Sequence, residues 1–171
     1  MGTPLRVLIV EDSEDDAALL VRELRRGGYD PEIRRVDTTA AMSAALDRET
    51  WDIVISDYTM PRFSAPAALS LFQERGLDVP FIIVSGTVGE DAAVAAMKAG
   101  AHDYLMKGKL ARLVPAVERE LREAEGRRER KRAEVTLEAL YRASLQIQEP
   151  LELQERIERL LQAAQTVLGL D

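Results

Sequence analysis

The chain has 171 residues, 46% of them hydrophobic and 31% charged, enough for one ordinary domain and an additional segment. Its formal net charge of -7 argues against a general nucleic-acid binder, because such proteins neutralise phosphates with basic surfaces. The absence of cysteine excludes disulfides, zinc thiolate sites and cysteine nucleophiles. The N-terminus lacks a secretory signal and no apolar run could span a bilayer, so we expect a cytoplasmic protein without membrane insertion.

Short apolar runs alternate with helical patterns over most of the chain. The predicted strands are 5–10, 32–37, 52–57, 80–85 and 103–107. The predicted helices are 14–27, 39–48, 64–75 and 88–99, with a fifth that starts near 110. Strands that alternate with helices indicate a parallel sheet with helices on both faces. We therefore predict a doubly wound, flavodoxin-like α/β fold with a five-stranded sheet in the order 2-1-3-4-5, whose polar second strand suits an edge.

Beyond residue 110 the sequence predicts only helices. The run 126–132 contains no apolar residue, and an apolar stripe resumes from Val135 until Pro150 ends the helix. We predict a main domain over 1–123, a helical linker or coiled coil over 124–149, and an amphipathic helix over 150–171. The last of these is expected to open a truncated downstream domain, because so short a segment cannot build a core of its own.

Chemically active side chains follow the predicted strands. Glu11 and Asp12 follow the first strand, Asp57 closes the third, Ser85 the fourth and Lys107 the fifth. Because ligands of open parallel sheets bind beyond the carboxyl ends of the strands, we expect these residues to gather at one edge. Neighbouring carboxylates repel one another unless a cation neutralises them, and a few oxygen ligands suit Mg²⁺.

Each residue also has an ordinary structural interpretation. The residues from Ser13 to Asp16 fit helix capping, and Asp57 followed by the segment 58–61 fits a turn. Ser85 fits a turn serine and Lys107 a solvated lysine. Their joint occurrence at separate strand ends favours function, because a carboxylate can form an aspartyl phosphate when positive charge lies beside it.

Taken in order, these segments resemble the receiver domain of bacterial two-component response regulators. The matching stretches are 7–12, 52–61, 80–86 and 99–107, and the resemblance covers roughly residues 5–123. It implies a Mg²⁺ cofactor and a role at each matching position: metal ligands at Glu11, Asp12 and Asp57, the phosphoacceptor at Asp57, the family's lysine at Lys107, the switch hydroxyl at Ser85, the switch aromatic at Tyr104, and a position that influences dephosphorylation at Thr59.

The resemblance also implies a mechanism. A histidine kinase or histidine phosphotransfer protein would transfer a phosphoryl group from phosphohistidine to Asp57, beside Mg²⁺ and Lys107. Ser85 would then bind the phosphate, Tyr104 would turn inward, and a helical or dimer interface that controls an output would change. Enzyme activity in this chain would be limited to self-phosphotransfer and autodephosphorylation, whereas a longer protein would carry a histidine kinase.

The residue after the lysine departs from the family pattern. Gly108 stands where most receivers have proline, often after a cis bond. A non-proline cis bond costs about 3 kcal/mol, so we expect a trans bond and a differently shaped loop. The serine at position 85, in place of the commoner threonine, preserves the hydroxyl.

Two other functions compete with this one. The main alternative is a phosphorylation-independent dimerisation or assembly module of a larger sensor kinase. A haloacid-dehalogenase-like phosphatase also uses an aspartyl phosphate, but Asp57-Tyr58-Thr59 lacks its second aspartate.

We expect a homodimer, formed through the face of the fourth and fifth helices or through the C-terminal helix. The end of the chain, from Leu137, resembles the start of a GAF-type sensory module. His102 is expected to be structural or merely exposed. The cognate kinase, the signal, the output and the phosphate lifetime are not predicted.

Overall fold

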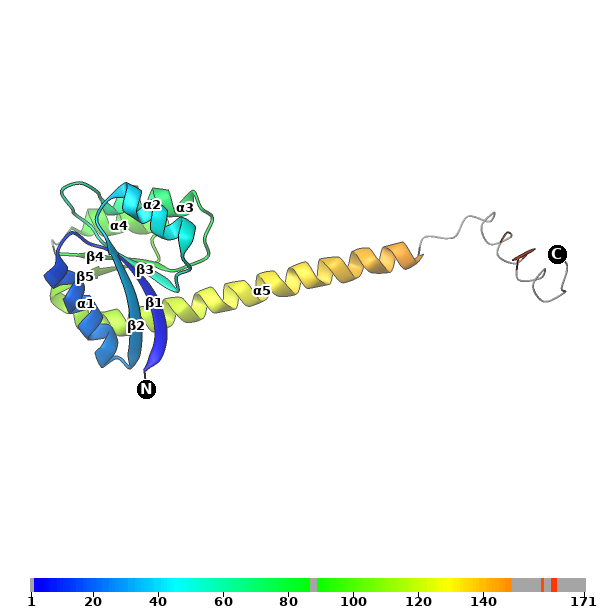
Figure 1. The fold of residues 1–171 in the computed structure, drawn as a ribbon, viewed down its shortest axis with the longest axis horizontal. Helices are drawn as coiled ribbons and strands as arrows, with labels where there is room; N and C mark the ends of the chain where they lie inside the picture. The colour runs from blue at the N-terminus through cyan, green and yellow to red at the C-terminus, as the bar shows by residue number, and fades with distance from the viewer. Residues whose placement is uncertain (1, 87–88, 149–157, 159–160, 163–171) are drawn as a thin grey trace. The chain divides into compact units, whose positions relative to one another are not determined.

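A parallel β-sheet forms the centre of the computed structural model, which describes residues 2–86, 89–148, 158, 161 and 162 (Figure 1). Its strands are β1 (Thr3–Val10), β2 (Tyr29–Val36), β3 (Ile53–Asp57), β4 (Phe81–Ser85) and β5 (Asp103–Met106). The helices are α1 (Glu14–Arg26), α2 (Thr39–Arg48), α3 (Ala65–Gln73), α4 (Glu90–Lys98), the 3₁₀ helix η1 (Lys107–Arg112) and α5 (Leu113–Gln148). The strands lie in the order β2-β1-β3-β4-β5, all parallel, which confirms the predicted fold.

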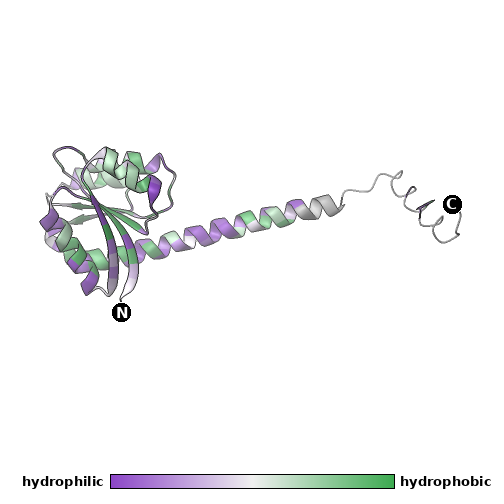
Figure 2. Cartoon of the chain, in the orientation of Figure 1, coloured by the Kyte–Doolittle hydropathy of each residue, from purple (hydrophilic) through white to green (hydrophobic). Residues whose placement is uncertain are grey.

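The two faces of the sheet carry separate hydrophobic cores, because successive residues of a strand point to opposite faces. Leu5, Val7 and Ile9 of β1 pack with α1 and the start of α5, whereas Leu8 and Val10 pack with α2, α3 and α4. Figure 1 shows helices on both sides of the sheet, and Figure 2 shows the central strands coloured as hydrophobic. Burial on both faces explains why these strands are nearly continuous apolar runs.

The strand β2 starts earlier than the sequence predicted. It begins at Tyr29 rather than at residue 32, and Pro31 within it pairs with Leu5 of β1. Proline donates no hydrogen bond, so a strand that contains it is tolerated at the edge of a sheet. Because β2 pairs with β1 alone, it is an edge strand of the sheet, as we predicted.

The helices α1, α2 and α3 begin after capping hydroxyls. Ser13, Thr38 and Ser64 accept a hydrogen bond from the backbone N–H three residues later, at 3.2, 3.3 and 3.5 Å. Such caps satisfy backbone donors that the helix leaves unpaired. The capping interpretation of Ser13 is therefore correct, and it fixes where α1 starts relative to β1.

The peptide bond between Lys107 and Gly108 is trans, as we expected from the glycine at that position. No peptide bond is cis among the described residues, and the chain enters η1 at Lys107. Because Lys107 opens this 3₁₀ turn, its side chain starts at the carboxyl end of β5.

The helix α5 continues through the charged run, which forms a largely hydrophilic stretch in Figure 2. Two arginines of this run form contacts with the segment that precedes β4. Arg127 forms an ion pair with Asp78 at 3.0 Å, and Arg128 donates to the Asp78 carbonyl at 2.6 and 3.1 Å. The chain divides into two compact units, Met1–Arg128 and Glu129–Asp171.

The C-terminal predictions lie mostly outside the part of the chain that the structure describes. This applies to the end of the helix at Pro150 and to most of the amphipathic segment 150–171. None of the helices that the described residues form is long and apolar enough to cross a membrane.

His102 has a structural role at the opposite end of the sheet from the strand carboxyl ends. The ring Nδ1 of His102 accepts a hydrogen bond from the backbone N–H of Phe81 at 3.1 Å. The backbone N–H of His102 donates to the Phe81 carbonyl at 2.8 Å. Burial lowers the pKa of His102, and the charge of Arg127 lowers it further. Three carboxylates oppose this shift: Glu120, Asp78 and Glu123.

This lowered pKa predicts a loss of stability in mild acid. An imidazolium cannot accept the Phe81 N–H, so the folded state disfavours protonation. The stability contribution is present above the unfolded-state pKa, near 6.5, and falls as the pH drops through the lower folded-state pKa. The slope contributed by His102 is at most about 1.4 kcal/mol per pH unit. Urea unfolding between pH 7 and pH 5 should show a steeper loss for the wild type than for His102→Asn, and equal slopes would contradict the assignment.

Candidate functional site

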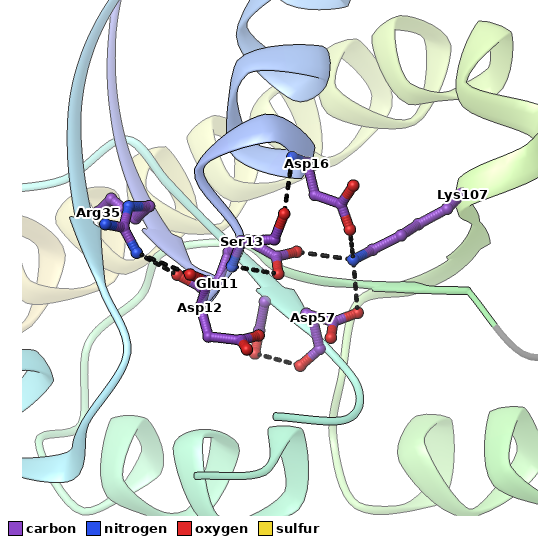
Figure 3. Close-up of polar contacts among 8 residues, drawn as sticks. Glu11, Asp12, Ser13, Asp16, Arg35, Asp57 and Lys107 are labelled. Carbon is purple, nitrogen blue, oxygen red and sulfur yellow. Dashed lines mark hydrogen bonds and ion pairs between the residues drawn. The ribbon is translucent and has the colours of Figure 1, made fainter. Parts of the chain in front are cut away.

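Four of the predicted site residues lie together at the carboxyl edge of the sheet: Glu11, Asp12, Asp57 and Lys107 (Figure 3). Glu11 follows β1 directly, Asp57 is the last residue of β3, and Lys107 follows β5. Ser85 ends β4, one residue beyond the Val84 that is paired with Asp57. The parallel order of the strands brings these positions together although almost a hundred residues separate the first from the last.

Three carboxylates form a cluster at this edge. Glu11, Asp12 and Asp57 each offer one oxygen, and these oxygens lie within 4.8 Å of one another. Glu11 and Asp57 are buried, with 1% and 7% of their surface exposed, whereas Asp12 is exposed. Hard oxygen donors with an open side match the preference of Mg²⁺, which keeps several water ligands. The donor set therefore fits the predicted ion.

Lys107 is the cation at the centre of the site. Its Nζ lies 2.8 Å from Glu11 Oε2, 2.5 Å from Asp16 Oδ2 and 3.2 Å from Asp57 Oδ1. Burial alone lowers the pKa of Lys107, but the hydrogen bonds to Asp16 and Glu11 and the charges of Glu11 and Asp57 outweigh burial. The pKa of Lys107 is thus raised above its ordinary value, and the ammonium stays charged.

Glu11 is held in place from two sides. Oε1 accepts the Ser13 N–H at 3.1 Å, and Oε2 accepts from Lys107. Burial raises the pKa of Glu11, while the hydrogen bonds from Lys107 and Ser13 oppose that rise. The carboxylate is therefore fixed between the first turn of α1 and the lysine.

Sequence reasoning missed Asp16 as a member of the site. We assigned it to the acidic first turn of α1, where it does lie, but its carboxylate also reaches Lys107. With Ser13 as the N-cap, Asp16 is the third residue of the helix, a position whose side chain reaches back toward the cap. This position was the one available signal that Asp16 faces the strand ends.

Arg35 of β2 was also missed. Its guanidinium donates to the carbonyls of Glu11 and Asp12 at 3.0 and 3.2 Å and pairs with Glu14 at 3.0 Å. These contacts hold the turn between β1 and α1, and with it the backbone that carries two of the clustered carboxylates.

The remaining predicted residues lie around this centre. Ser85 is buried beside Asp57 on the neighbouring strand. Tyr104 packs edge-on against Tyr58 with ring centroids 6.0 Å apart, and its buried hydroxyl has no hydrogen-bond partner among the described residues. Thr59 is exposed in a turn that an antiparallel bridge to Ser64 closes.

The fold and the site together define a receiver-type domain, the class whose motifs the sequence shares. The family model of the response regulator receiver domain matches residues 7–118, and the chain belongs to this family.

Curated relatives and a solved structure agree with this assignment. The transcriptional regulatory protein PrrA of Mycobacterium tuberculosis is 35% identical over 121 residues, covering 70% of this chain and 51% of that protein. The response regulator protein FleR of Pseudomonas aeruginosa is 36% identical over 102 residues, covering 60% of this chain and 21% of FleR. The crystal structure of NtrX from Brucella abortus superposes with a TM-score of 0.67 and 26% identity, covering 77% of this chain and 30% of NtrX. The chain thus spans about half or less of these proteins.

Proposed function

We propose that the chain is the phosphoacceptor receiver of a two-component phosphorelay and that Asp57 accepts the phosphoryl group. The observation that carries this proposal is the Asp57 carboxylate, buried within a cluster of three carboxylates and 3.2 Å from the Lys107 ammonium. A scaffold has no need of such an arrangement, because carboxylates that face one another without a bound cation repel.

The proposed reaction is a transfer between two proteins. An oxygen of Asp57 supplies an electron pair to the phosphorus of a phosphohistidine on a histidine kinase or a histidine phosphotransfer protein. The P–N bond breaks, its electron pair returns to the imidazole, which takes up a proton, and an aspartyl phosphate forms. Lys107 offers an N–H to the transferred group and balances its charge.

Glu11, Asp12 and Asp57 would hold Mg²⁺, which supplies positive charge beside the phosphoryl group when bound. The chain's own residues prepare this environment. Lys107 and the Ser13 N–H fix Glu11, and Arg35 fixes the turn that carries Asp12. The exposed side of the cluster leaves room for the donor.

Phosphorylation is proposed to switch a helical surface. Ser85 would bind the new phosphate, Tyr104 would move with it, and the exposed Thr59 would influence the access of water to the phosphate. Support comes from the burial of Ser85 beside Asp57 and from the Tyr104 hydroxyl, which makes no hydrogen bond within the described residues. One charge-assisted hydrogen bond, worth about 1.5–3 kcal/mol, is of the size of a typical allosteric coupling.

A change in association between copies of the chain is the proposed effect of phosphorylation, and this interface would control an output. Val94 and Met97 of α4 are exposed apolar side chains on one candidate face. A second candidate is α5, where the exposed apolar side chains are Val135, Leu137, Leu140 and Tyr141. The latter stripe also favours the second candidate function, an assembly module that ignores phosphate. Size measurements with and without phosphate separate the two, since only the switch predicts a change.

The Mg²⁺ requirement tests the proposed site. Acetyl phosphate with Mg²⁺ should add one phosphate to the intact mass, and EDTA should prevent the gain. Asp12→Asn should raise the Mg²⁺ concentration for half-maximal phosphorylation at least about tenfold, because it removes a metal ligand. Asp15→Asn is the matched control, since it removes an equal charge from an exposed neighbour outside the cluster. Equal Mg²⁺ dependence of the two variants would contradict the metal site.

A further inference from the structure

Asp16 contacts the same ammonium as the proposed phosphoacceptor. Lys107 Nζ lies 2.5 Å from Asp16 Oδ2 and 3.2 Å from Asp57 Oδ1. The contact with Asp16 is a hydrogen bond between residues 91 positions apart, which ties the first turn of α1 to the start of η1. Neither the predicted metal ligands nor the predicted switch residues include Asp16.

Asp16, Asp57 and Glu11 surround the same ammonium. Figure 3 shows their carboxylates on opposite sides of the Lys107 nitrogen, with Glu11 on a third. An ammonium has three N–H groups, and Glu11, Asp16 and Asp57 lie near enough to engage all of them. Asp16 and Glu11 form the hydrogen bonds, and Asp57 has the longest of the three distances.

A phosphoryl group on Asp57 changes this balance. It brings about two negative charges and additional acceptor oxygens to the side of the ammonium that faces Asp57. The Asp16 carboxylate neutralises part of the lysine charge that the phosphoryl group requires, and it repels the anionic donor. Because the Asp16 side chain is 36% exposed, solvent screens the competition, and the expected effect is moderate.

We propose that Asp16 competes with the phosphoryl group on Asp57 for the Lys107 ammonium and thereby lowers the rate and extent of phosphorylation. Asp16 acts through Lys107 and does not touch the phosphoryl group. The inference rests on the proposed function of Asp57 and adds to it a residue that sets how readily the receiver is phosphorylated.

Substitution by asparagine isolates the charge. Asp16→Asn keeps the shape and one amide oxygen that can accept from Lys107, while the backbone N–H of residue 16 still donates to Ser13 Oγ. Asp15→Asn removes the same charge from the same helical turn. Asp15 is exposed and has no ion pair among the described residues, so it controls for net charge and for the helix dipole. Asp16→Glu restores the charge and tests rescue.

Intact mass should be followed over time with acetyl phosphate and saturating Mg²⁺ for the wild type, the three variants and Asp57→Asn. Asp16→Asn should be phosphorylated about two- to fivefold faster than Asp15→Asn, the range expected for losing a partly exposed ion pair. Asp16→Glu should return toward the wild-type rate. The Mg²⁺ concentration that half-maximally raises the melting temperature should be equal for Asp16→Asn and Asp15→Asn, because Asp16 lies outside the carboxylate cluster.

The outcomes separate this inference from the function beneath it. If Asp16→Asn reacts no faster than Asp15→Asn while the wild type is phosphorylated, the competition is refuted and the receiver function stands. A slower reaction would instead make Asp16 an anchor that orients Lys107, and a weakened Mg²⁺ response would make it a metal ligand; both overturn the proposal. If neither the wild type nor Asp57→Asn gains phosphate, the proposed function fails and the inference fails with it.

Discussion

Replacing Asp57 by asparagine should abolish the gain of phosphate from acetyl phosphate and Mg²⁺. An amide has no negative oxygen to attack phosphorus, although it occupies almost the same volume as the carboxylate. The loss is expected to be complete, whereas the Asp15→Asn control should gain phosphate as the wild type does. Intact mass spectrometry over a time course measures both.

The fold should survive this substitution. One oxygen of Asp57 lies within 4.8 Å of oxygens of Glu11 and Asp12, so removing the Asp57 charge relieves repulsion in the absence of metal. The substitution also removes the ion pair of Asp57 with Lys107, but Lys107 keeps its hydrogen bonds to Glu11 and Asp16. The melting temperature of Asp57→Asn in EDTA should therefore match or exceed that of the wild type. Phosphate gain that persists in this folded variant would show that another side chain is the acceptor.

Replacing Phe81 by alanine should lower the free energy of unfolding more than any other substitution proposed for this chain. Phe81 is fully buried in β4 and packs on Phe72 with ring centroids 5.4 Å apart. Truncating a buried phenylalanine costs about 3–5 kcal/mol, through lost transfer free energy and the cavity left behind. This is a large part of the roughly 5–15 kcal/mol that stabilises a typical domain. Urea unfolding at pH 7 measures the difference.

An exposed apolar residue provides the control for Phe81. Val94 of α4 is 52% exposed, and Val94→Ala should change the unfolding free energy by less than about 0.5 kcal/mol. Because Phe81 opens β4 and the site lies at the other end of the strands, Phe81→Ala protein that remains folded should still accept phosphate. Equal stability of the two variants would contradict the assignment of Phe81 to the core.

The sheet and most of the site could be predicted because their signals are local. The apolar run Leu5–Val10 marks a strand buried on both faces, and the strand order follows from short right-handed connections between strands and helices. Once that order is assumed, the carboxyl edge must carry Glu11, Asp57 and Lys107. To predict that these side chains lie together, it was enough to know the type of each residue and its place at the end of a strand.

The contacts that were missed depend on side-chain paths across the fold. Asp16 meets Lys107 from 91 positions away, and Arg127 meets Asp78 from 49 positions away. In the sequence, Asp16 already has an ordinary local role as an acid in the first turn of a helix. Arg127 likewise fits as one of several charged residues in the run 126–132. The early start of β2 was missed because a strand that includes Pro31 is tolerated only at an edge, where pairing with β1 outweighs the missing donor.

The division into 1–123, 124–149 and 150–171 and the coiled coil remain predictions, as does the GAF-type module. The exposed apolar side chains of α5 are one surface through which copies of the chain would associate. Sedimentation of the chain with and without acetyl phosphate measures whether copies of the chain associate and whether phosphorylation changes that association.

The most direct test of the central claim is to locate the phosphate. Chain treated with acetyl phosphate and Mg²⁺ should be reduced with borohydride, which converts an aspartyl phosphate to homoserine, and then digested and sequenced by mass spectrometry. We predict homoserine at position 57 and unmodified aspartate at positions 12 and 16. Homoserine at another aspartate, or none despite a gain of phosphate, would contradict the assignment of Asp57 as the phosphoacceptor.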